Sequence, residues 1–296
     1  MHRRHTLAAA ALLAASAAHA QPAHDWSAVD AALGRKGAAQ PGGVQRYGFP
    51  RGDLQVTLGS VRLAPALALG GWLAFLDVGG GRAMAMGDLV LLESEVGPVM
   101  RALQAGGVEQ TALHNHVLGE SPHVMYMHVA AHGDPVAIAR TVRDALAHTA
   151  TPAAAPPSAA PPTIELDTAA IARTLGFGGK ANGGVYQVSV PRRESIRDDG
   201  HELPPSMGVA TGINFQPTGG GRAAVTGDFV LRSTEVNPVI RALHAGGIEI
   251  TALHSHMIDE EPRLLFMHFW ANDDALKLAR ALRGALDHTA VKTASR

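Results

Sequence analysis

The chain has 296 residues, enough for two domains of ordinary size, and 46% of them are hydrophobic while only 4% are aromatic. This composition predicts globular cores rich in Ala, Val and Leu rather than a disordered chain. The formal net charge of -1 offers no basic surface for a nucleic-acid partner. Cysteine is absent, which excludes disulfides, thiolate catalysis and zinc–thiolate sites, so any metal must be held by nitrogen and oxygen ligands.

Residues 1–20 have the pattern of a secretory signal peptide. A basic start precedes an apolar run over residues 6–17, and a small-x-small cleavage site ends at Ala20. The apolar run is too short to span a bilayer as a helix, and no other run reaches about 18 apolar residues without charge. We therefore expect cleavage after Ala20, a periplasmic or secreted location, and no membrane insertion after signal cleavage.

The rest of the chain contains the same pattern twice, displaced by 140 positions. Residues 87–128 and 227–268 are identical at 24 of 42 positions without a gap. Such similarity indicates an internal duplication, and we favour a pseudo-two-fold pair of domains over two independent ones. The predicted repeat domains cover residues 21–149 and 164–296, and a Pro- and Ala-rich linker over residues 150–163 should be extended.

Each repeat opens with a helix and a strand. The first helix is predicted over residues 26–34, with Ser27 as its cap and Gly34 at its end, and its counterpart covers residues 166–176. Apolar and polar residues then alternate over residues 53–59, which predicts a half-buried strand, and the counterpart is placed over residues 185–190.

A hairpin follows in each repeat, with three glycines at the turn over residues 79–81 or 219–221. The next helix has Ser94 or Thr234 as its N-cap candidate and ends at a Gly-Gly pair. Two strands and a closing helix complete each repeat. The fold class is therefore α+β, with two homologous repeats, each an antiparallel sheet with packed helices, forming a pseudo-two-fold pair.

The most informative stretch is Thr111-Ala-Leu-His-Asn-His-Val-Leu-Gly-Glu120, which returns as Thr251-Ala-Leu-His-Ser-His-Met-Ile-Asp-Glu260. Both copies have His-x-His-x-x-x-Glu, and another histidine follows eight residues after the glutamate. Residues two apart in a strand point to the same face, and an antiparallel neighbour can bring the third histidine alongside. Each repeat is thus expected to present one set of ligands. The candidate metal ligands are His114, His116, Glu120, His128, His254, His256, Glu260 and His268.

Imidazole and carboxylate ligands suit zinc, iron, manganese or copper better than calcium or magnesium. If the protein is an enzyme, the metal would activate a water molecule, and Glu120 and Glu260 are the candidate catalytic residues, each as a ligand or a general base. No Walker loop or dinucleotide fingerprint occurs, so no nucleotide cofactor is expected. The partner would be a small molecule or a component of the cell envelope.

The same histidines also fit a structural role. A single histidine is more often a hydrogen-bonded residue than a metal ligand, and both copies can preserve a polar network that holds the sheet together. The protein would then be a non-enzymatic cell-envelope module that binds a protein or cell-wall partner. Chelator sensitivity separates the two hypotheses, because only the metal site predicts it.

Nearly the whole chain after residue 20 also resembles a known family, clearly in the second repeat and with differences at a few positions of the first. The stretches Gly227-Asp-Phe-Val-Leu231, Glu235-Val-Asn-Pro-Val-Ile240, Gly247-Ile-Glu-Ile-Thr-Ala-Leu-His-Ser-His256 and Glu261-Pro-Arg-Leu-Leu-Phe-Met-His-Phe-Trp270 are similar to the LppY/LpqO family of exported bacterial proteins. The named mycobacterial members are lipoproteins, and since this chain has no cysteine, the resemblance implies soluble export. It implies a duplicated domain of unknown function and no particular reaction. The His-x-His-x-x-x-Glu spacing is also similar to cupin metal strands, but a helix precedes the motif here, which argues against a double β-barrel.

Overall fold

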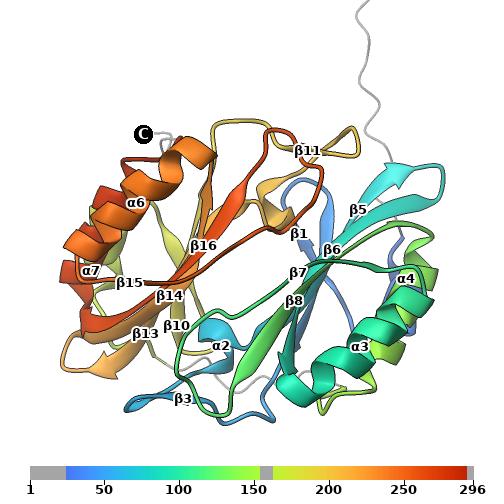
Figure 1. The fold of residues 1–296 in the computed structure, drawn as a ribbon, viewed down its shortest axis with the longest axis horizontal. Coiled ribbons are helices and arrows are strands. Elements are labelled where there is room, and N and C mark those ends of the chain that lie inside the picture. Colours follow the sequence, from blue (N-terminus) through green and yellow to red (C-terminus); the bar gives the residue numbers. More distant parts are fainter. Residues whose placement is uncertain (1–24, 154–162, 292–296) are drawn as a thin grey trace, which may run out of the picture.

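The computed structural model describes residues 25–153 and 163–291 (Figure 1). The predicted signal peptide, residues 1–20, and most of the predicted linker lie outside these ranges. In the described ranges, no helix combines the length and the apolar character needed to cross a membrane.

Each repeat contains one six-stranded antiparallel sheet, and the two sheets have matching strand orders. The first sheet runs β1 (Ala38–Gln40), β2 (Val44–Pro50), β5 (Gly70–Gly79), β6 (Arg82–Leu92), β8 (Val124–Gly133) and β7 (Glu109–His114). The second runs β9 (Gly179–Asn182), β10 (Val185–Pro191), β13 (Ala210–Gly219), β14 (Arg222–Leu231), β16 (Leu265–Asp274) and β15 (Glu249–His254). The predicted α+β fold of two paired repeats is therefore correct.

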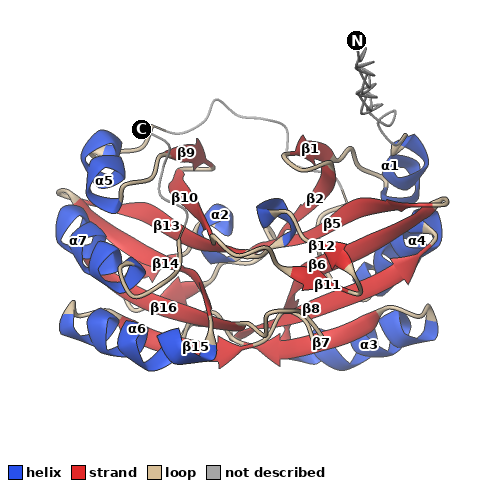
Figure 2. Ribbon diagram, turned by 90° about the horizontal axis from the view of Figure 1, so that it is seen from above, coloured by secondary structure: helices blue, strands red, loops and turns tan. Residues whose placement is uncertain are grey.

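Helices cover the outer face of each sheet, as Figure 2 shows. The first sheet carries α1 (Ser27–Leu33), α3 (Glu93–Ala105) and α4 (Pro135–Leu146), and the second carries α5 (Thr168–Leu175), α6 (Ser233–Ala245) and α7 (Ala275–Leu286). Each helical layer forms an apolar core with its own sheet. Gly34 ends α1 in the left-handed conformation, with φ of 67°, as predicted.

The predicted N-cap residues are wrong. Ser27 is the first residue inside α1, and Ser94 lies inside α3. The backbone N–H of Leu92 instead donates to the Glu95 carboxylate at 2.8 Å, and Arg232 donates to Glu235 at 2.7 Å at the start of α6. A carboxylate in the first turn thus satisfies a free N–H group, which is the task expected of the hydroxyl.

The predicted hairpins are present, but one predicted strand is misplaced. Gly79–Gly81 and Gly219–Gly221 connect β5 to β6 and β13 to β14, all with positive φ. Residues 53–59 are not in the main sheet, and the counterpart of β10 is β2. Tyr47 and Phe49 of β2 are buried in the helical core, although Gly48 and Pro50 adjoin them in the sequence.

Each repeat has one segment between its strands that extends across to the other repeat, and we call these two segments the arms. The first arm, residues 51–69, contains β3 (Thr57–Leu58), β4 (Val61–Arg62) and α2 (Pro65–Ala68). The second arm, residues 192–209, contains β11 (Arg197–Asp198), β12 (His201–Glu202) and the 3-10 helix η1 (Pro205–Met207). Figure 2 shows β11 and β12 lying over the sheet of the first repeat.

Each arm covers the inner face of the other repeat's sheet. The Ala64 N–H donates to Gln216 Oε1 at 2.8 Å, and Gln187 Nε2 donates to the Ala66 carbonyl at 2.9 Å. In return, Arg46 Nη1 donates to the Ser206 carbonyl at 3.1 Å. Two apolar clusters contain residues of both repeats, so the inner faces and the arms form a shared core.

Candidate metal centre

Six histidines meet between the inner faces of the two sheets. We call them the histidine cluster, and its members are His114, His116, His128, His254, His256 and His268. Among these six imidazole rings, the closest pairs join different repeats. The ring centroids are 3.7 Å apart for His114 and His254, 3.9 Å for His116 and His268, and 3.8 Å for His128 and His256.

Strand register places the third histidine of each motif beside an aspartate. His128 on β8 pairs with Asp88 on β6, and His268 on β16 pairs with Asp228 on β14. Opposite residues of an antiparallel pair point to the same face, so these aspartates also face the cluster. Sequence reasoning missed them as candidate ligands, although the dipeptide Gly-Asp stands at both positions of the duplication and was a usable signal.

The two motif strands end near each other, at the middle of the molecule in Figure 2. His114 and His254 are the last residues of β7 and β15, and His116 and His256 lie in the loops that follow. Hydrogen bonds then join the repeats: Thr111 Oγ1 to the His256 carbonyl at 2.6 Å, Thr251 Oγ1 to the His116 carbonyl at 2.6 Å, Asn115 Nδ2 to the Thr251 carbonyl at 2.9 Å, and Ser255 Oγ to the Thr111 carbonyl at 3.3 Å. The residue between the two histidines of each motif therefore holds the repeats together.

Backbone carbonyls orient the rings. The Nδ1 atoms lie within hydrogen-bond distance of carbonyl oxygens: His128 of Gly87 at 3.1 Å, His268 of Gly227 at 2.7 Å, His256 of Gly208 at 3.2 Å, and His114 of Asn115 at 3.1 Å. A carbonyl only accepts, so each Nδ1 carries the proton and each Nε2 keeps its lone pair. This is how histidine ligands are commonly prepared for a metal ion.

Five histidines have a buried Nε2 atom without a hydrogen-bond partner among the described residues: His114, His116, His128, His254 and His268. The Nδ1 atom of His254 is also buried without a partner there. His116 Nε2 lies 3.2 Å from Asp88 Oδ2 without hydrogen-bond geometry, and His256 Nε2 lies 2.9 Å from Asp228 Oδ2. The free lone pairs thus converge on one buried space.

Burial keeps the imidazoles neutral. It lowers the pKa of His116, His128 and His268 well below the usual value, and neighbouring imidazoles lower each further. It also lowers the pKa of His256 to about 3, and it raises the pKa of the Asp228 carboxyl to about 6. Neutral imidazole is the form that binds metals, so the cluster is held in its ligating state.

The geometry differs from the expectation of one ligand set per repeat. Three groups bring their ligand atoms within 4.8 Å of one another: His114 with His128 and His254; His114 with His116 and His268; and Asp228 with His254 and His256. Two of the three groups mix residues of both repeats. The repeats therefore share one centre.

The structure places the two motif glutamates in the turns after the motif. Glu120 Oε1 accepts from the Val124 N–H at 3.1 Å, and Glu260 Oε1 accepts from the Leu264 N–H at 2.7 Å. Glu260 also lies 3.2 Å from Arg263 Nη1, and burial raises the pKa of its carboxyl. Within the described ranges, neither glutamate belongs to the three groups of metal-ligand atoms. A local backbone N–H binds each carboxylate and holds it in the turn.

An aromatic ring supports the second histidine of each motif. The Tyr126 ring centroid lies 3.3 Å from that of His116, and Phe266 lies 3.5 Å from His256. Both rings are stacked on the imidazole and are buried. These residues were also missed in the sequence, since an aromatic residue two positions before a histidine is common in any buried strand.

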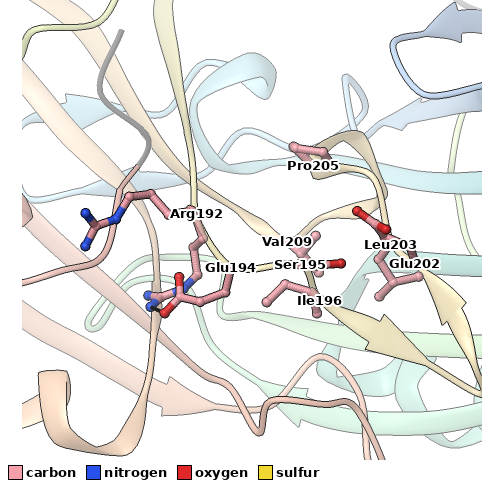
Figure 3. Close-up of a pocket in the computed structure, with 9 residues that line it drawn as sticks. Arg192, Glu194, Ser195, Ile196, Glu202, Leu203, Pro205 and Val209 are labelled. Carbon is pink, nitrogen blue, oxygen red and sulfur yellow. Dashed lines mark hydrogen bonds and ion pairs between the residues drawn. The ribbon is translucent and has the colours of Figure 1, made fainter.

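A small cavity of about 110 Å³ lies along the second arm (Figure 3). Arg192 and Glu194 stand at one end of it and Glu202 at the other. Arg192 is already paired with Glu194 at 2.9 Å and with Glu235 at 2.7 Å. The cavity lining contains no member of the histidine cluster, so we assign this cavity no part in the site.

Comparison with known proteins identifies a family. The family model described as Domain of Unknown Function (DUF1259) matches residues 27–148 and again residues 169–288. The chain belongs to this family. Each match coincides with one repeat, so the duplicated unit is the DUF1259 domain.

Two solved structures are weakly similar. One is the trimeric bacterial microcompartment shell protein PduB, with 13% identity, a TM-score of 0.20, and coverage of 84% of this chain and 88% of that chain. The other is EtuB from Clostridium kluyveri, with 11% identity, a TM-score of 0.20, and coverage of 84% and 90%. No curated protein matches the chain significantly.

Proposed function

We propose that the protein binds a divalent transition-metal ion through the histidine cluster between its two DUF1259 domains. One observation carries the proposal: buried Nε2 atoms lack a hydrogen-bond partner in the described part of the chain, while the Nδ1 atoms are tied to carbonyls. Leaving a buried polar atom unpaired costs about 1–3 kcal/mol. A metal ion would give several such atoms their partner at once.

The chemistry of the ligands favours zinc, copper, iron or manganese. Imidazole nitrogens dominate the cluster, and Asp88 and Asp228 add carboxylate oxygens. Calcium and magnesium prefer sites made of oxygen ligands. In an enzymatic version of the proposal, the ion would activate a water molecule. Asp88 and Asp228 stand closer to the imidazoles than Glu120 and Glu260 do, so an aspartate is the better candidate for the base.

A structural role for the histidines is the second candidate. The hydrogen bonds of Thr111, Asn115, Thr251 and Ser255 join the repeats directly, and the imidazoles stack on one another. In that case the protein would be an envelope module that binds a protein or cell-wall partner. Its melting temperature would not change with chelator, whereas a metal site predicts a fall of several degrees.

Export is part of the proposal. Residues 1–20 have the signal-peptide pattern, and the similarity to the LppY/LpqO family points to an exported protein. Mass spectrometry of the protein from the periplasm tests this, since a chain that begins at Gln21 is expected. A chain that retains Met1 and stays with the cytoplasm would contradict export.

Elemental analysis is the decisive experiment. The mature protein, residues 21–296, is purified without an affinity His-tag, and at least about one equivalent of zinc, copper, iron or manganese is expected. The variant His254→Ala/His256→Ala should bind less metal than the wild type. The matched control is His148→Ala/His288→Ala, which removes two exposed histidines at helix ends and should retain it. A wild-type protein that holds no metal and takes none up on titration would contradict the proposal.

A further inference from the structure

We infer that the histidine cluster holds two metal ions in two crossed sites, each built from both repeats. Site A takes His114 and His116 from the first repeat and His268 from the second. Site B takes His254 and His256 from the second repeat and His128 from the first. The inference rests on the proposed function, since it specifies how many ions the cluster binds and which residues hold each one.

The ligand distances support site A directly. The ligand atoms of His114, His116 and His268 lie within 4.8 Å of one another. The His116 and His268 ring centroids are 3.9 Å apart, although the two residues belong to different repeats. The Nε2 atoms of all three residues are buried and have no hydrogen-bond partner in the described chain. Three imidazoles with free lone pairs make a typical zinc or copper ligand set.

Site B is the counterpart of site A in the duplication. A shift of 140 positions converts His114 into His254 and His116 into His256, and it converts His128 into His268. The ligand atoms of His254 and His256 lie within 4.8 Å of each other and of Asp228. The His128 ring centroid lies 3.8 Å from that of His256, which matches the 3.9 Å of the equivalent pair in site A. The ligand atoms of His128 lie within 4.8 Å of those of His254 and also of His114, and we assign His128 to site B because it is the duplicate of His268 in site A.

One aspartate stands beside each site. Asp88 Oδ2 lies 3.2 Å from His116 Nε2 in site A, and Asp228 Oδ2 lies 2.9 Å from His256 Nε2 in site B. The Oδ1 atoms of both aspartates are buried and unpartnered among the residues described. With its aspartate, each proposed site would offer three nitrogens and one oxygen, which is the number of ligands that zinc commonly takes. The carboxylate also offsets part of the ion's charge, and a buried ion requires such an offset.

The two proposed sites meet at a central pair of imidazoles. His114 of site A stacks on His254 of site B with ring centroids 3.7 Å apart and an interplanar angle of 15°. Each of these rings has neighbours in both repeats, so the position of one ring fixes the position of the other. Filling one site should therefore help to order the second.

Two double variants distinguish crossed sites from one site per repeat. His116→Ala/His268→Ala removes two ligands of site A, so one equivalent of zinc should remain bound in site B. His116→Ala/His128→Ala removes one ligand from each site, so both equivalents should be lost or bound at least about 100-fold more weakly. Both variants lose one loop histidine and one strand histidine, which makes them matched controls. Sites confined to single repeats predict the reverse result.

The mirror pair repeats the test in the other half of the molecule. His256→Ala/His128→Ala should keep one equivalent, and His256→Ala/His268→Ala should keep none. Circular dichroism and gel filtration of the metal-free variants identify any variant that fails to fold, and the mirror variant then decides the assignment. If the two members of each pair lose metal equally, the crossed assignment is wrong.

A cobalt titration of the wild-type, metal-free chain counts the ions without any variant. Two crossed sites predict that the visible absorbance of bound Co²⁺ rises until two equivalents have been added. A break at one equivalent overturns the two-ion inference and leaves the proposed metal binding intact. No cobalt absorbance and no zinc uptake would instead contradict the proposed function itself.

Discussion

The two repeats hold their histidines alike and differ in the residues around them. His128 and His268 both bond the carbonyl of a glycine on the neighbouring strand. However, the ring that stacks on the second histidine of the motif is Tyr126 in the first repeat and Phe266 in the second. A flat ring therefore packs on the imidazole in both repeats, and only the first repeat carries a hydroxyl there.

The arms differ more than the sites they cover. The first arm contains a short ribbon and a helical turn, and the second contains a ribbon and η1. Leu67 of the first arm and Met207 of the second are nevertheless both buried against the opposite sheet. Covering an apolar face depends on buried area and shape rather than on a specific sequence. The arms therefore differ in sequence while the histidine positions of the two repeats match.

Acid should have the largest effect on the stability of the metal-free protein, and it should destabilise both repeats equally. Burial lowers the folded-state pKa of His116, His128 and His268 below 6.5, so the stability they contribute is complete above that pH. It is lost as the pH falls below 6.5, by on the order of 1 kcal/mol per histidine per pH unit. The metal-free protein should therefore be several kcal/mol less stable at pH 5.5 than at pH 7.5 in urea denaturation.

The Asp228 carboxyl should change the stability with pH in the opposite direction from the histidines. Because its folded pKa is raised from 3.8 to about 6, its contribution is present at low pH and is lost as the pH rises through about 6. One carboxyl offsets only part of the effect of several histidines. His128→Gln and His268→Gln should each reduce the pH dependence by similar amounts. A pH-independent free energy of unfolding would contradict neutral burial of the cluster.

Replacing the buried arginines should cause the next largest loss of stability. Arg51 pairs with Glu95 at 2.7 Å, and Arg192 pairs with Glu235 at 2.7 Å, so each ties the end of a strand to a helix. Arg51→Met and Arg192→Met each leave a carboxylate without its partner, and each should lower the free energy of unfolding by about 3–5 kcal/mol. Chemical denaturation measures both losses.

The exposed Arg143 provides the control for these two variants, because Arg143→Met breaks only a surface pair with Asp144 and should cost less than about 1 kcal/mol. Losses at Arg51 and Arg192 that differ by more than about 2 kcal/mol would show that the repeats do not share this brace.

Exchanging the aromatic residues tests the difference itself. Phe266→Tyr adds a buried hydroxyl to the second repeat and should cost about 1–3 kcal/mol. The reverse change, Tyr126→Phe, removes a hydroxyl that has no hydrogen-bond partner among the described residues, so stability should stay unchanged or increase. Thermal melting of both variants provides the measurement. A large loss in Tyr126→Phe would reveal a role for the hydroxyl in the first repeat.

The hydrogen bonds between the repeats should give the smallest effect. Thr111→Val and Thr251→Val each remove a 2.6 Å bond to a backbone carbonyl of the other repeat, at a cost of about 1 kcal/mol. Thr226→Val is the matched control, since the Thr226 hydroxyl is buried without a partner in the described chain. Equal losses at Thr111 and Thr251, with none at Thr226, are expected in urea denaturation.

Local patterns in the sequence predicted much of the fold. The shift of 140 positions revealed the repeats, and the glycine turns at residues 79–81 and 219–221 marked the hairpins, because such turns depend on neighbouring residues alone. The β2 strand was missed because Gly48 and Pro50 interrupt it, and its strand state depends on pairing with β5. Pairing between distant segments is a tertiary effect that overrides local propensity.

The site was only partly predictable for the same reason. The spacing of His114, His116 and His128 identified the imidazoles that now face each other across the repeats. The spacing within one repeat carries no information about which partner each ring meets in the other repeat. Asp88 and Asp228 became candidates only through strand register. The two predicted glutamates accept hydrogen bonds from backbone N–H groups of their own turns, and their part in metal binding stays a prediction.

The exchange of arms has a consequence for how the molecule unfolds. Either repeat without the other would expose the inner face of its sheet to water, so each repeat depends on the other to bury that face. Because both repeats belong to one chain, their pairing does not depend on protein concentration. Unfolding of either repeat would also expose the inner face of the other repeat's sheet. The whole chain should therefore melt in one transition and release any bound metal at the same time.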